Sequence, residues 1–224
     1  MKALLEKLDI AYKDISIYEV ALTHASFANE NHVDKNERLE FLGDAVIQLL
    51  MSGYLFKEID EDEGTLTKRR AQAVREEALV IYANAIGLST HIKLGKGETQ
   101  KGANDAMIAD AFEALFGATF LDLGFSAVKK LFQKCIVPHL HRVWNIKDYK
   151  STLQEIIQSG DKRNISYHIL KETGPSHDKH FEAVVKLDQT IILGFGKGKT
   201  KKEAEQNAAK EALKKGNYDF KEGV

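Results

Sequence analysis

The hydrophobic pattern of this chain changes near Trp144, and this change limits the folds open to it. Before that point apolar residues recur at helical spacing, and the alternation typical of strands is nearly absent. Beyond it, a helical stretch (146–160) precedes three β-rich runs, and another helical stretch (200–216) follows them. The β-rich runs cover residues 166–173, 180–187 and 190–196. The pattern predicts an all-α domain over 1–147 and an α+β domain of order α-β-β-β-α over 148–224.

Capping residues set the expected ends of the helices in the first half. The predicted helices cover residues 1–14, 63–88 and 106–124, together with one that begins after Asn36. Asn36 is a favourable N-cap, and either Asn104 or Asp105 is a plausible cap for the helix over 106–124. Gly87 is suited to end the helix over 63–88. Residues 93–105 are rich in Gly and Lys and predict a loop.

Composition excludes several classes of protein. The single cysteine, Cys135, rules out internal disulfides and a cysteine-rich zinc site. We found no apolar run that approaches the roughly 20 residues of a membrane span. The N-terminal residues carry early acidic side chains and no small-residue cleavage site, unlike a signal peptide. We therefore expect a cytoplasmic protein without a membrane partner.

Two apolar helices carry acidic side chains in an unusual arrangement. On the helix after Asn36, Glu37, Glu40 and Asp44 fall within an arc of about 60°, bordered by apolar residues. On the helix over 106–124, Asp110 and Glu113 are three residues apart, and Gly117 lies between them on the helical wheel. Carboxylates at the edge of apolar helices are costly unless a positive charge pairs with them.

Two kinds of positive partner are open for these acids. One is a set of arginines, for which the candidates are Arg38, Arg69, Arg70 and Arg75. The other is a divalent metal ion, since Mg²⁺ uses carboxylate oxygens together with water and phosphate. Solvated acids without a functional role are the remaining interpretation, and the pattern alone does not decide among the three.

The charge of the second half points to a polyanionic partner. Residues 148–224 carry 14 basic against 12 acidic side chains, whereas residues 1–147 carry 18 against 21. The excess is concentrated over 196–215, where Lys201 and Lys202 begin the last helical stretch. Lysines at a helix N-terminus attract phosphate together with the backbone N–H groups. A solvated helix start is the alternative interpretation.

Four segments resemble the ribonuclease III family. "NERLEFLGDAV" (36–46) resembles the family signature, and "ADAFEALFGATFLDLG" (109–124) resembles its second acidic segment. "ALTHASFANE" (21–30) and "DEGTLTKRRAQAV" (62–74) resemble flanking segments. The α-β-β-β-α unit is similar to the family's double-stranded RNA-binding domain. The resemblance implies an all-α nuclease domain followed by an RNA-binding domain.

The resemblance also implies an activity and its residues. Family members cut both strands of duplex RNA with Mg²⁺, which Mn²⁺ can replace, and leave 5′-phosphate ends and short 3′ overhangs. Glu40, Asp110 and Glu113 would bind metal, and Asp44 would orient ligands or metal-bound water. Glu37 and Glu63 match supporting acids near the rim of the cleft. The expected substrates are ribosomal RNA precursors and structured messenger RNA.

We predict RNA contacts in the second domain from side chains suited to A-form RNA. Gln154, Glu155 and Gln158 can hydrogen-bond 2′-hydroxyl groups, and His177 lies on a predicted turn. Lys201 and Lys202 would contact phosphates. The loop over 93–105 is either a further backbone contact or a solvated loop.

Cutting two strands requires two acid clusters, and a two-fold homodimer is the commonest way to supply them. Phe41, beside the carboxylates on the wheel, is the candidate interface residue, with a place in the internal core as the alternative. We therefore predict a dimeric, Mg²⁺-dependent endoribonuclease for duplex RNA. The alternatives are a non-catalytic double-stranded RNA-binding protein and a metal-binding helical dimer that acts independently of RNA.

Overall fold

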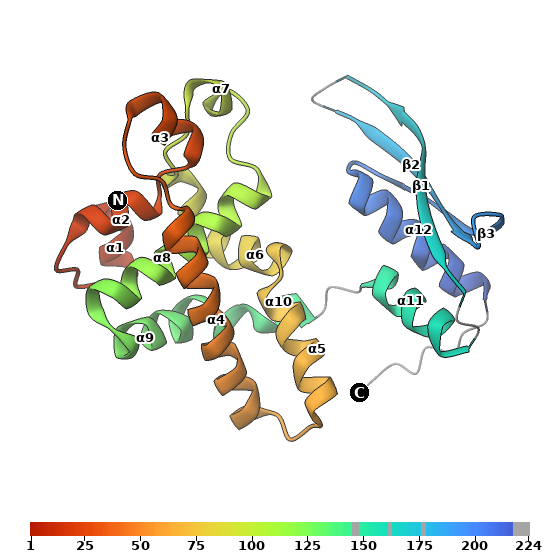
Figure 1. Ribbon diagram of the computed structural model, residues 1–224, viewed down its shortest axis with the longest axis horizontal. Helices are drawn as coiled ribbons and strands as arrows, with labels where there is room; N and C mark the ends of the chain where they lie inside the picture. Colours follow the sequence, from red (N-terminus) through yellow and green to blue (C-terminus); the bar gives the residue numbers. More distant parts are fainter. Residues whose placement is uncertain (145–147, 161–162, 176–177, 217–224) are drawn as a thin grey trace. The chain divides into compact units, whose positions relative to one another are not determined.

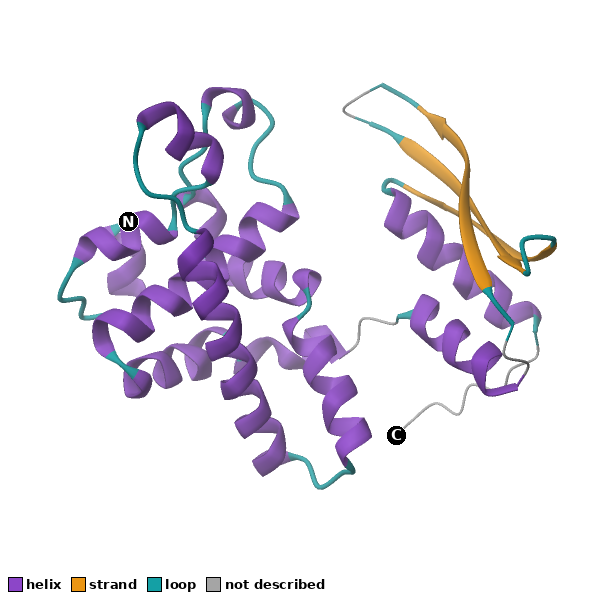
Figure 2. Ribbon diagram, viewed as in Figure 1, coloured by secondary structure: helices purple, strands orange, loops and turns teal. Residues whose placement is uncertain are grey.

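The computed structural model describes residues 1–144, 148–160, 163–175 and 178–216. The chain divides into two units, Met1–Ile146 and Lys147–Val224, which are described separately (Figure 1). The boundary predicted between residues 147 and 148 adjoins residues 145–147, which lie outside the described part. The described first unit is helical, and the second contains a sheet, which confirms the predicted fold class (Figure 2).

The first unit is built around two long helices, α4 and α8, that pack against each other. Its helices are α1 (Lys2–Lys7), α2 (Ile15–Ala21), α3 (Ala25–Asn31), α4 (Glu37–Glu58), α5 (Glu63–Val74), α6 (Glu76–Ile86), α7 (Lys96–Thr99), α8 (Asp105–Leu123), α9 (Phe125–Cys135) and α10 (Leu140–Trp144), with 3-10 turns at Leu88–His91 and Val137–His139. The buried residues of α4 recur every three or four positions, so one side of this helix faces the core. From Ala111 to Thr119, α8 is buried at every position except Glu113, as expected of a central helix.

Two boundaries predicted from the sequence are wrong. The helix predicted over 63–88 is two helices, because the backbone of Arg75 is extended (φ −70°, ψ 159°) between α5 and α6. The helix predicted over 1–14 ends at Lys7, and Asp9 then adopts a left-handed conformation (φ 58°). The start predicted after Asn36 is confirmed, since α4 begins at Glu37, although the buried Asn36 side chain makes no capping hydrogen bond.

Other predicted caps are confirmed. Gly87 ends α6 in the left-handed conformation (φ 78°) that glycine adopts readily. Between the two candidate caps of α8, the structure selects Asn104, whose side chain accepts a hydrogen bond from the Met107 N–H at 2.9 Å. The loop predicted over 93–105 contains the short helix α7.

Helix α4 has the length and composition of a membrane-spanning helix, although charged side chains interrupt its apolar run. The core helix of a globular unit passes the same test. Seven residues of α4 are buried within the first unit, among them Val46, Leu50 and Leu55. Packing inside the unit therefore accounts for the buried side of α4, whereas Phe41, Leu49 and Phe56 of the same helix are exposed.

The second unit is a three-stranded antiparallel sheet covered on one face by helices. Its elements are α11 (Tyr149–Gly160), β1 (Ile165–Thr173), β2 (His180–Leu187), β3 (Ile191–Gly198) and α12 (Lys201–Lys215), with the strands in the order β1-β2-β3. Gly194, Gly196 and Gly198 face α12, and a Cβ atom on Gly196 would lie 2.1 Å from the Ala204 carbonyl oxygen. Alternate glycines on β3 therefore let α12 pack directly on the sheet.

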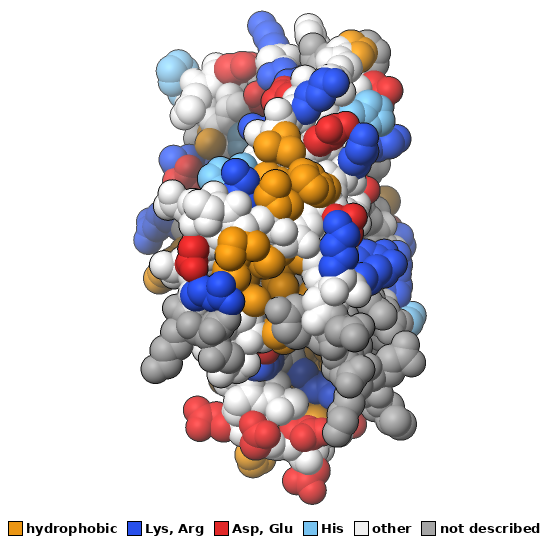
Figure 3. Space-filling view, turned by 90° about the vertical axis from the view of Figure 1, so that its right-hand side faces the viewer, with side chains coloured by type: hydrophobic (Ala, Val, Ile, Leu, Met, Phe, Trp, Pro, Cys, Tyr) orange, Lys and Arg blue, Asp and Glu red, His pale blue; other side chains and the backbone are white. Residues whose placement is uncertain are grey.

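The opposite face of this sheet exposes apolar side chains. Leu170, Ile192 and Phe195 are each about half exposed, and hydrophobic side chains gather on the face seen in Figure 3. Val184 of β2 pairs with His168 of β1 and with Phe195 of β3, and its side chain is fully buried. The hydrophobic core of the second unit lies on the other face of the sheet, where α11 and α12 pack.

Candidate active site

The close crossing of α4 and α8 depends on two glycines. A Cβ atom on Gly43 would lie 1.8 Å from the carbonyl oxygen of Glu113, and one on Gly117 would lie 2.2 Å from that of Leu39. Real Cβ atoms essentially never come so close to other atoms, so any side chain at either position would push the helices apart. The two glycines thus allow the backbones to touch where the acidic side chains are located.

This crossing gathers the four predicted acids, Glu40 and Asp44 from α4 and Asp110 and Glu113 from α8. All four are half-buried. Burial, and then the charges of Asp44, Glu40 and Asp110, raise the pKa of Glu113 from 4.5 to about 8. Burial, followed by Asp110 and other acids, likewise raises the pKa of Glu40. The four carboxylates therefore act on one another as a single electrostatic group.

Asp110 adds two neighbours to this group. Burial is the largest effect raising its pKa, and Glu76 and Glu37 add to it. The charge of His24 acts in the opposite direction and lowers the pKa of Asp110. The His24 ring accepts a hydrogen bond at Nδ1 from the Ser26 N–H (3.2 Å), which places it as the N-cap of α3.

No arginine neutralises the cluster among the described residues. Arg70 donates to the Ser52 hydroxyl (3.1 Å), Arg69 lies over the Trp144 ring, and Arg75 lies 3.6 Å from Glu77. Within the described ranges, the structure records no ion pair to Glu40, Asp44, Asp110 or Glu113. The described residues therefore give no support to the arginine interpretation, and a divalent metal ion or solvated acids remain as the interpretations of this cluster.

The donor chemistry of the cluster fits a hard divalent cation. All four side chains offer carboxylate oxygens, and burial followed by repulsion from the other three acids raises the pKa of Glu113. In the described part of the chain no three His, Cys, Asp or Glu side chains converge into a ready-made ligand shell. Mg²⁺ suits such an open set, because it keeps several waters and is bound by carboxylates together with substrate phosphate, so it needs no closed shell of protein ligands.

The two supporting acids predicted for the rim occupy different places. Glu37 begins α4, is exposed, and pairs with Lys35 at 2.6 Å, yet its charge still raises the pKa of Glu40 and of Asp110. Glu63 is exposed at the start of α5, just after the far end of α4 (Figure 1). The rise of an α-helix puts Asp44 and the end of α4 at Glu58 about 21 Å apart. Within one chain Glu63 therefore belongs to a separate region.

Three residues near the cluster were not singled out in the sequence. The role of Gly43 could not be predicted, because the sequence does not show which element a glycine inside a helix packs against. His24 lies in the segment 21–30, but nothing in that segment shows its proximity to Asp110. Gln48 donates from Nε2 to both oxygens of Asp44, at 2.8 and 3.0 Å. Its spacing of four residues from Asp44 was the available signal, since side chains four apart on a helix are neighbours.

The predicted RNA contacts lie on the helical side of the second unit. Gln154, Glu155 and Gln158 are all outside the core on α11, and the first two line an open cavity of about 370 Å³ with Lys150 and Tyr167. Lys150 pairs with Glu205 of α12 at 2.5 Å, which ties the two helices together.

The N-terminus of α12 presents the two predicted lysines. Lys201 and Lys202 are exposed, and the Thr200 side chain caps the helix by accepting a hydrogen bond from the Glu203 N–H at 3.1 Å. His177, the remaining predicted contact, lies outside the described residues.

Phe41 is not part of the core, because its side chain is 81% exposed. Leu49 and Phe56 are also exposed, and the three fall within an arc of about 80° on α4. Large exposed apolar patches are rare on monomeric proteins and mark interaction surfaces. The core alternative for Phe41 is excluded, and its role at a dimer interface stays a prediction.

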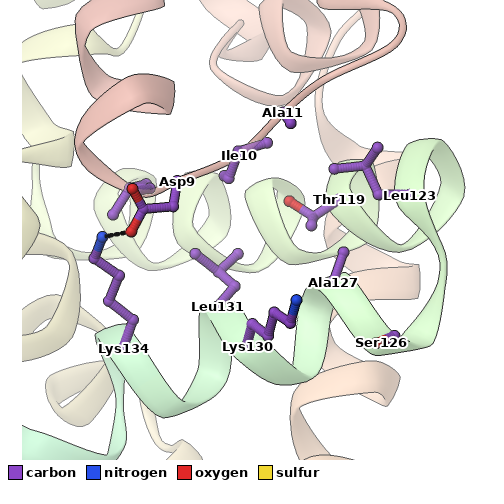
Figure 4. A pocket seen from close by; sticks show the side chains of 11 residues that line it. Asp9, Ile10, Ala11, Thr119, Leu123, Ser126, Ala127, Lys130, Leu131 and Lys134 are labelled. Atoms are coloured by element: carbon purple, nitrogen blue, oxygen red, sulfur yellow. Dashed lines mark hydrogen bonds and ion pairs between the residues drawn. The ribbon is translucent and has the colours of Figure 1, made fainter.

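The first unit also has a hollow that lies apart from the acids. It has a volume of about 480 Å³ and lies between the segment after α1, the end of α8 and helix α9 (Figure 4). Lys134 and Asp9 form an ion pair at its edge, and Ile10 and Leu131 contribute apolar lining. None of the four acids contributes to this hollow.

Comparisons with known proteins agree with both units. Residues 14–140 match the family described as "Ribonuclease-III-like", and residues 149–215 match "Double-stranded RNA binding motif". Ribonuclease 3 of Onion yellows phytoplasma (strain OY-M) is 50% identical over 218 residues, which are 96% of this chain and 91% of the relative. Ribonuclease 3 of Staphylococcus aureus (strain Mu50 / ATCC 700699) is 46% identical over 93% of this chain and 88% of its own length.

A solved structure is similar to the first unit. It is the nuclease domain of ribonuclease III from Campylobacter jejuni, with 38% sequence identity and a TM-score of 0.56. The match covers 59% of this chain and 93% of that domain. The description of that structure refers to flexibility in a region involved in dimer formation.

Proposed function

The chain belongs to the ribonuclease III family and is an endoribonuclease with a double-stranded RNA-binding domain, and from this premise we propose that it cuts both strands of an RNA duplex with Mg²⁺. One observation carries the proposal. Four half-buried carboxylates meet at the crossing of α4 and α8, and no described basic side chain pairs with them. Such an arrangement is unfavourable by itself and becomes favourable when a cation binds.

Each acid has a proposed part in the reaction. Glu40, Asp110 and Glu113 hold Mg²⁺, for which Mn²⁺ can substitute, and Asp44 orients ligands within the same cluster. A bound divalent ion lowers the pKa of water and neutralises charge on the phosphate. Burial and the neighbouring acids raise the pKa of Glu113 to about 8, so this side chain would give up a proton on binding a cation. The products would carry 5′-phosphate ends and short 3′ overhangs.

The second unit would hold the duplex by its shape. Gln154, Glu155 and Gln158 would reach 2′-hydroxyl groups in the minor groove, while Lys201 and Lys202 would contact phosphates. Their exposure supports this proposal, since none of the five is committed to the core. Ribosomal RNA precursors and structured messenger RNA are the proposed substrates, and the cytoplasm is the proposed location.

Cleavage of both strands further requires a homodimer. The exposed stripe of Phe41, Leu49 and Phe56 on α4 supports this assembly, because a second copy would cover apolar side chains that otherwise face water. The stripe lies on the helix that carries Glu40 and Asp44, so a dimer formed through it would place two acid clusters on one assembly.

The test is cleavage of a long perfect RNA duplex by wild type and Glu113→Gln, in Mg²⁺ and in Ca²⁺. We expect Mg²⁺-dependent cutting by the wild type, and binding without cutting by the variant. Equal cutting by both would refute the role of Glu113. Tight binding with no cutting by either would favour a non-catalytic RNA-binding protein. Salt-independent binding that survives Lys201→Ala/Lys202→Ala would argue against phosphate contacts at these lysines.

A further inference from the structure

Asp44 differs from the other three acids of the cluster in how it is held. The Gln48 amide nitrogen donates to both of its oxygens, at 2.8 and 3.0 Å. Within the described ranges, Glu40, Asp110 and Glu113 have no recorded side-chain hydrogen-bond partner. The position of one carboxylate in the cluster is therefore fixed by a neighbouring side chain.

Gln48 itself occupies an ordered position. It is half-buried, one helical turn beyond Asp44 on α4. Ser52, one turn further, donates from its hydroxyl to the Gln48 carbonyl oxygen at 2.8 Å, and Arg70 of α5 donates to the same hydroxyl at 3.1 Å. Ser52 therefore links the backbone of Gln48 to α5, while the Gln48 side chain makes the contact with Asp44.

The chemistry of an amide suits this position. A Lys or Arg at residue 48 would orient Asp44 but would also neutralise it and compete with a cation. A Glu would add one more negative charge to a cluster in which burial and repulsion already disfavour ionisation. A neutral donor holds the carboxylate in one orientation and leaves its charge available, as do the outer-shell partners that orient metal ligands in other proteins.

We propose that Gln48 is a positioning residue that fixes the orientation of Asp44 and thereby sets the affinity of the acid cluster for divalent metal. The inference rests on the proposed metal-dependent function and deepens it. Gln48 does not touch the reacting phosphate in this role. Its effect passes through Asp44, so removing the amide should weaken metal binding while duplex RNA binds as before.

The experiment compares three variants of the full-length protein with the wild type. Gln48→Met keeps the length of the side chain and removes the donor, and Gln48→Asn keeps an amide. Gln133→Met makes the same chemical change at an exposed position of α9 and is the matched control. Mn²⁺ binding without RNA is measured by electron paramagnetic resonance. Cleavage is titrated with Mg²⁺, thermal unfolding is followed in EDTA, and sedimentation gives the mass of each variant.

We expect Gln48→Met to weaken Mn²⁺ binding about tenfold or more, and to raise the half-saturating Mg²⁺ concentration to match. Gln48→Asn should recover part of the loss, and Gln133→Met should behave as wild type. The KM for duplex RNA, the mass and the unfolding temperature in EDTA should stay unchanged. Adding Gln48→Met to Asp44→Asn should cause no further loss, because both changes remove the same interaction.

Two results would overturn the inference. Unchanged Mn²⁺ affinity in Gln48→Met would show that the hydrogen bond to Asp44 has no part in metal binding. Losses that multiply in the double variant would show that Gln48 acts by a route other than Asp44. A wild type that binds no Mn²⁺ and cleaves without Mg²⁺ would instead refute the metal site itself, and the role of Gln48 with it.

Discussion

Gly43→Ala should inactivate the enzyme by moving the two acidic helices apart. The added Cβ would lie 1.8 Å from the Glu113 carbonyl oxygen, whereas carbon and oxygen normally approach to about 3.3 Å. Relief of this overlap requires a separation of roughly 1.5 Å between α4 and α8 at their crossing. Misplacement of catalytic groups by about 1 Å can cost about 100-fold in rate. We therefore expect a loss of duplex cleavage of at least that size, measured at saturating Mg²⁺.

The free energy of unfolding of this variant should fall by at most about 2 kcal/mol. Overpacking costs about 1–3 kcal/mol, and replacing glycine by alanine inside a helix returns about 1 kcal/mol. Gly53→Ala is the control, because it makes the same change on the same helix where nothing lies within 4 Å of the new Cβ. It should keep full activity and gain up to about 1 kcal/mol in the free energy of unfolding. If the two variants were equally active and equally stable, the close crossing would not be what positions the acids.

The remaining predictions concern charge, assembly and RNA. Since burial and neighbouring carboxylates raise the pKa of Glu113 to about 8, the native state binds more protons than the unfolded state between about pH 4.5 and 8. Thermal unfolding in EDTA should therefore show wild-type stability falling as pH rises through this window, and Glu113→Gln should flatten the fall; parallel pH profiles would contradict the assignment. Phe41→Asp should convert the proposed homodimer to monomers in sedimentation, and an unchanged mass would show that Phe41 is not part of its interface. Lys201→Ala/Lys202→Ala should reduce the slope of log affinity against log salt by about 2, and an unchanged slope would show that these lysines miss the phosphates.

The elements that could be predicted from the sequence are those with a local cause. The β-rich runs matched β1 to β3 because strands and their turns are encoded in short stretches. Gly87 ended α6 because a left-handed residue is needed there and glycine provides it. The acids on α4 could be placed on one side of the helix, since helical spacing alone fixes which side chains are neighbours.

The features that could not be predicted depend on contacts between distant segments. The break at Arg75 interrupts a stretch whose apolar spacing remains helical, so periodicity alone joined α5 and α6 into one helix. The function of Gly43 depends on Glu113, some seventy residues later, and no local rule connects them. Whether Phe41 is buried or exposed also depends on what packs around α4, and its 81% exposure became known only from the structure.

The acid cluster shows how the same contacts serve the fold and oppose it. Phe112 and Phe116, on either side of Glu113 along α8, pack with ring centroids 5.1 Å apart and hold this helix in the core. That packing keeps Glu113 half-buried beside three other carboxylates, so ionisation of the cluster works against the fold. A cation that binds only the native state stabilises it by mass action, because it removes the same repulsion. The proposed cofactor should therefore also stabilise the nuclease unit, and Mg²⁺ should raise the unfolding temperature of the wild type more than that of Glu113→Gln.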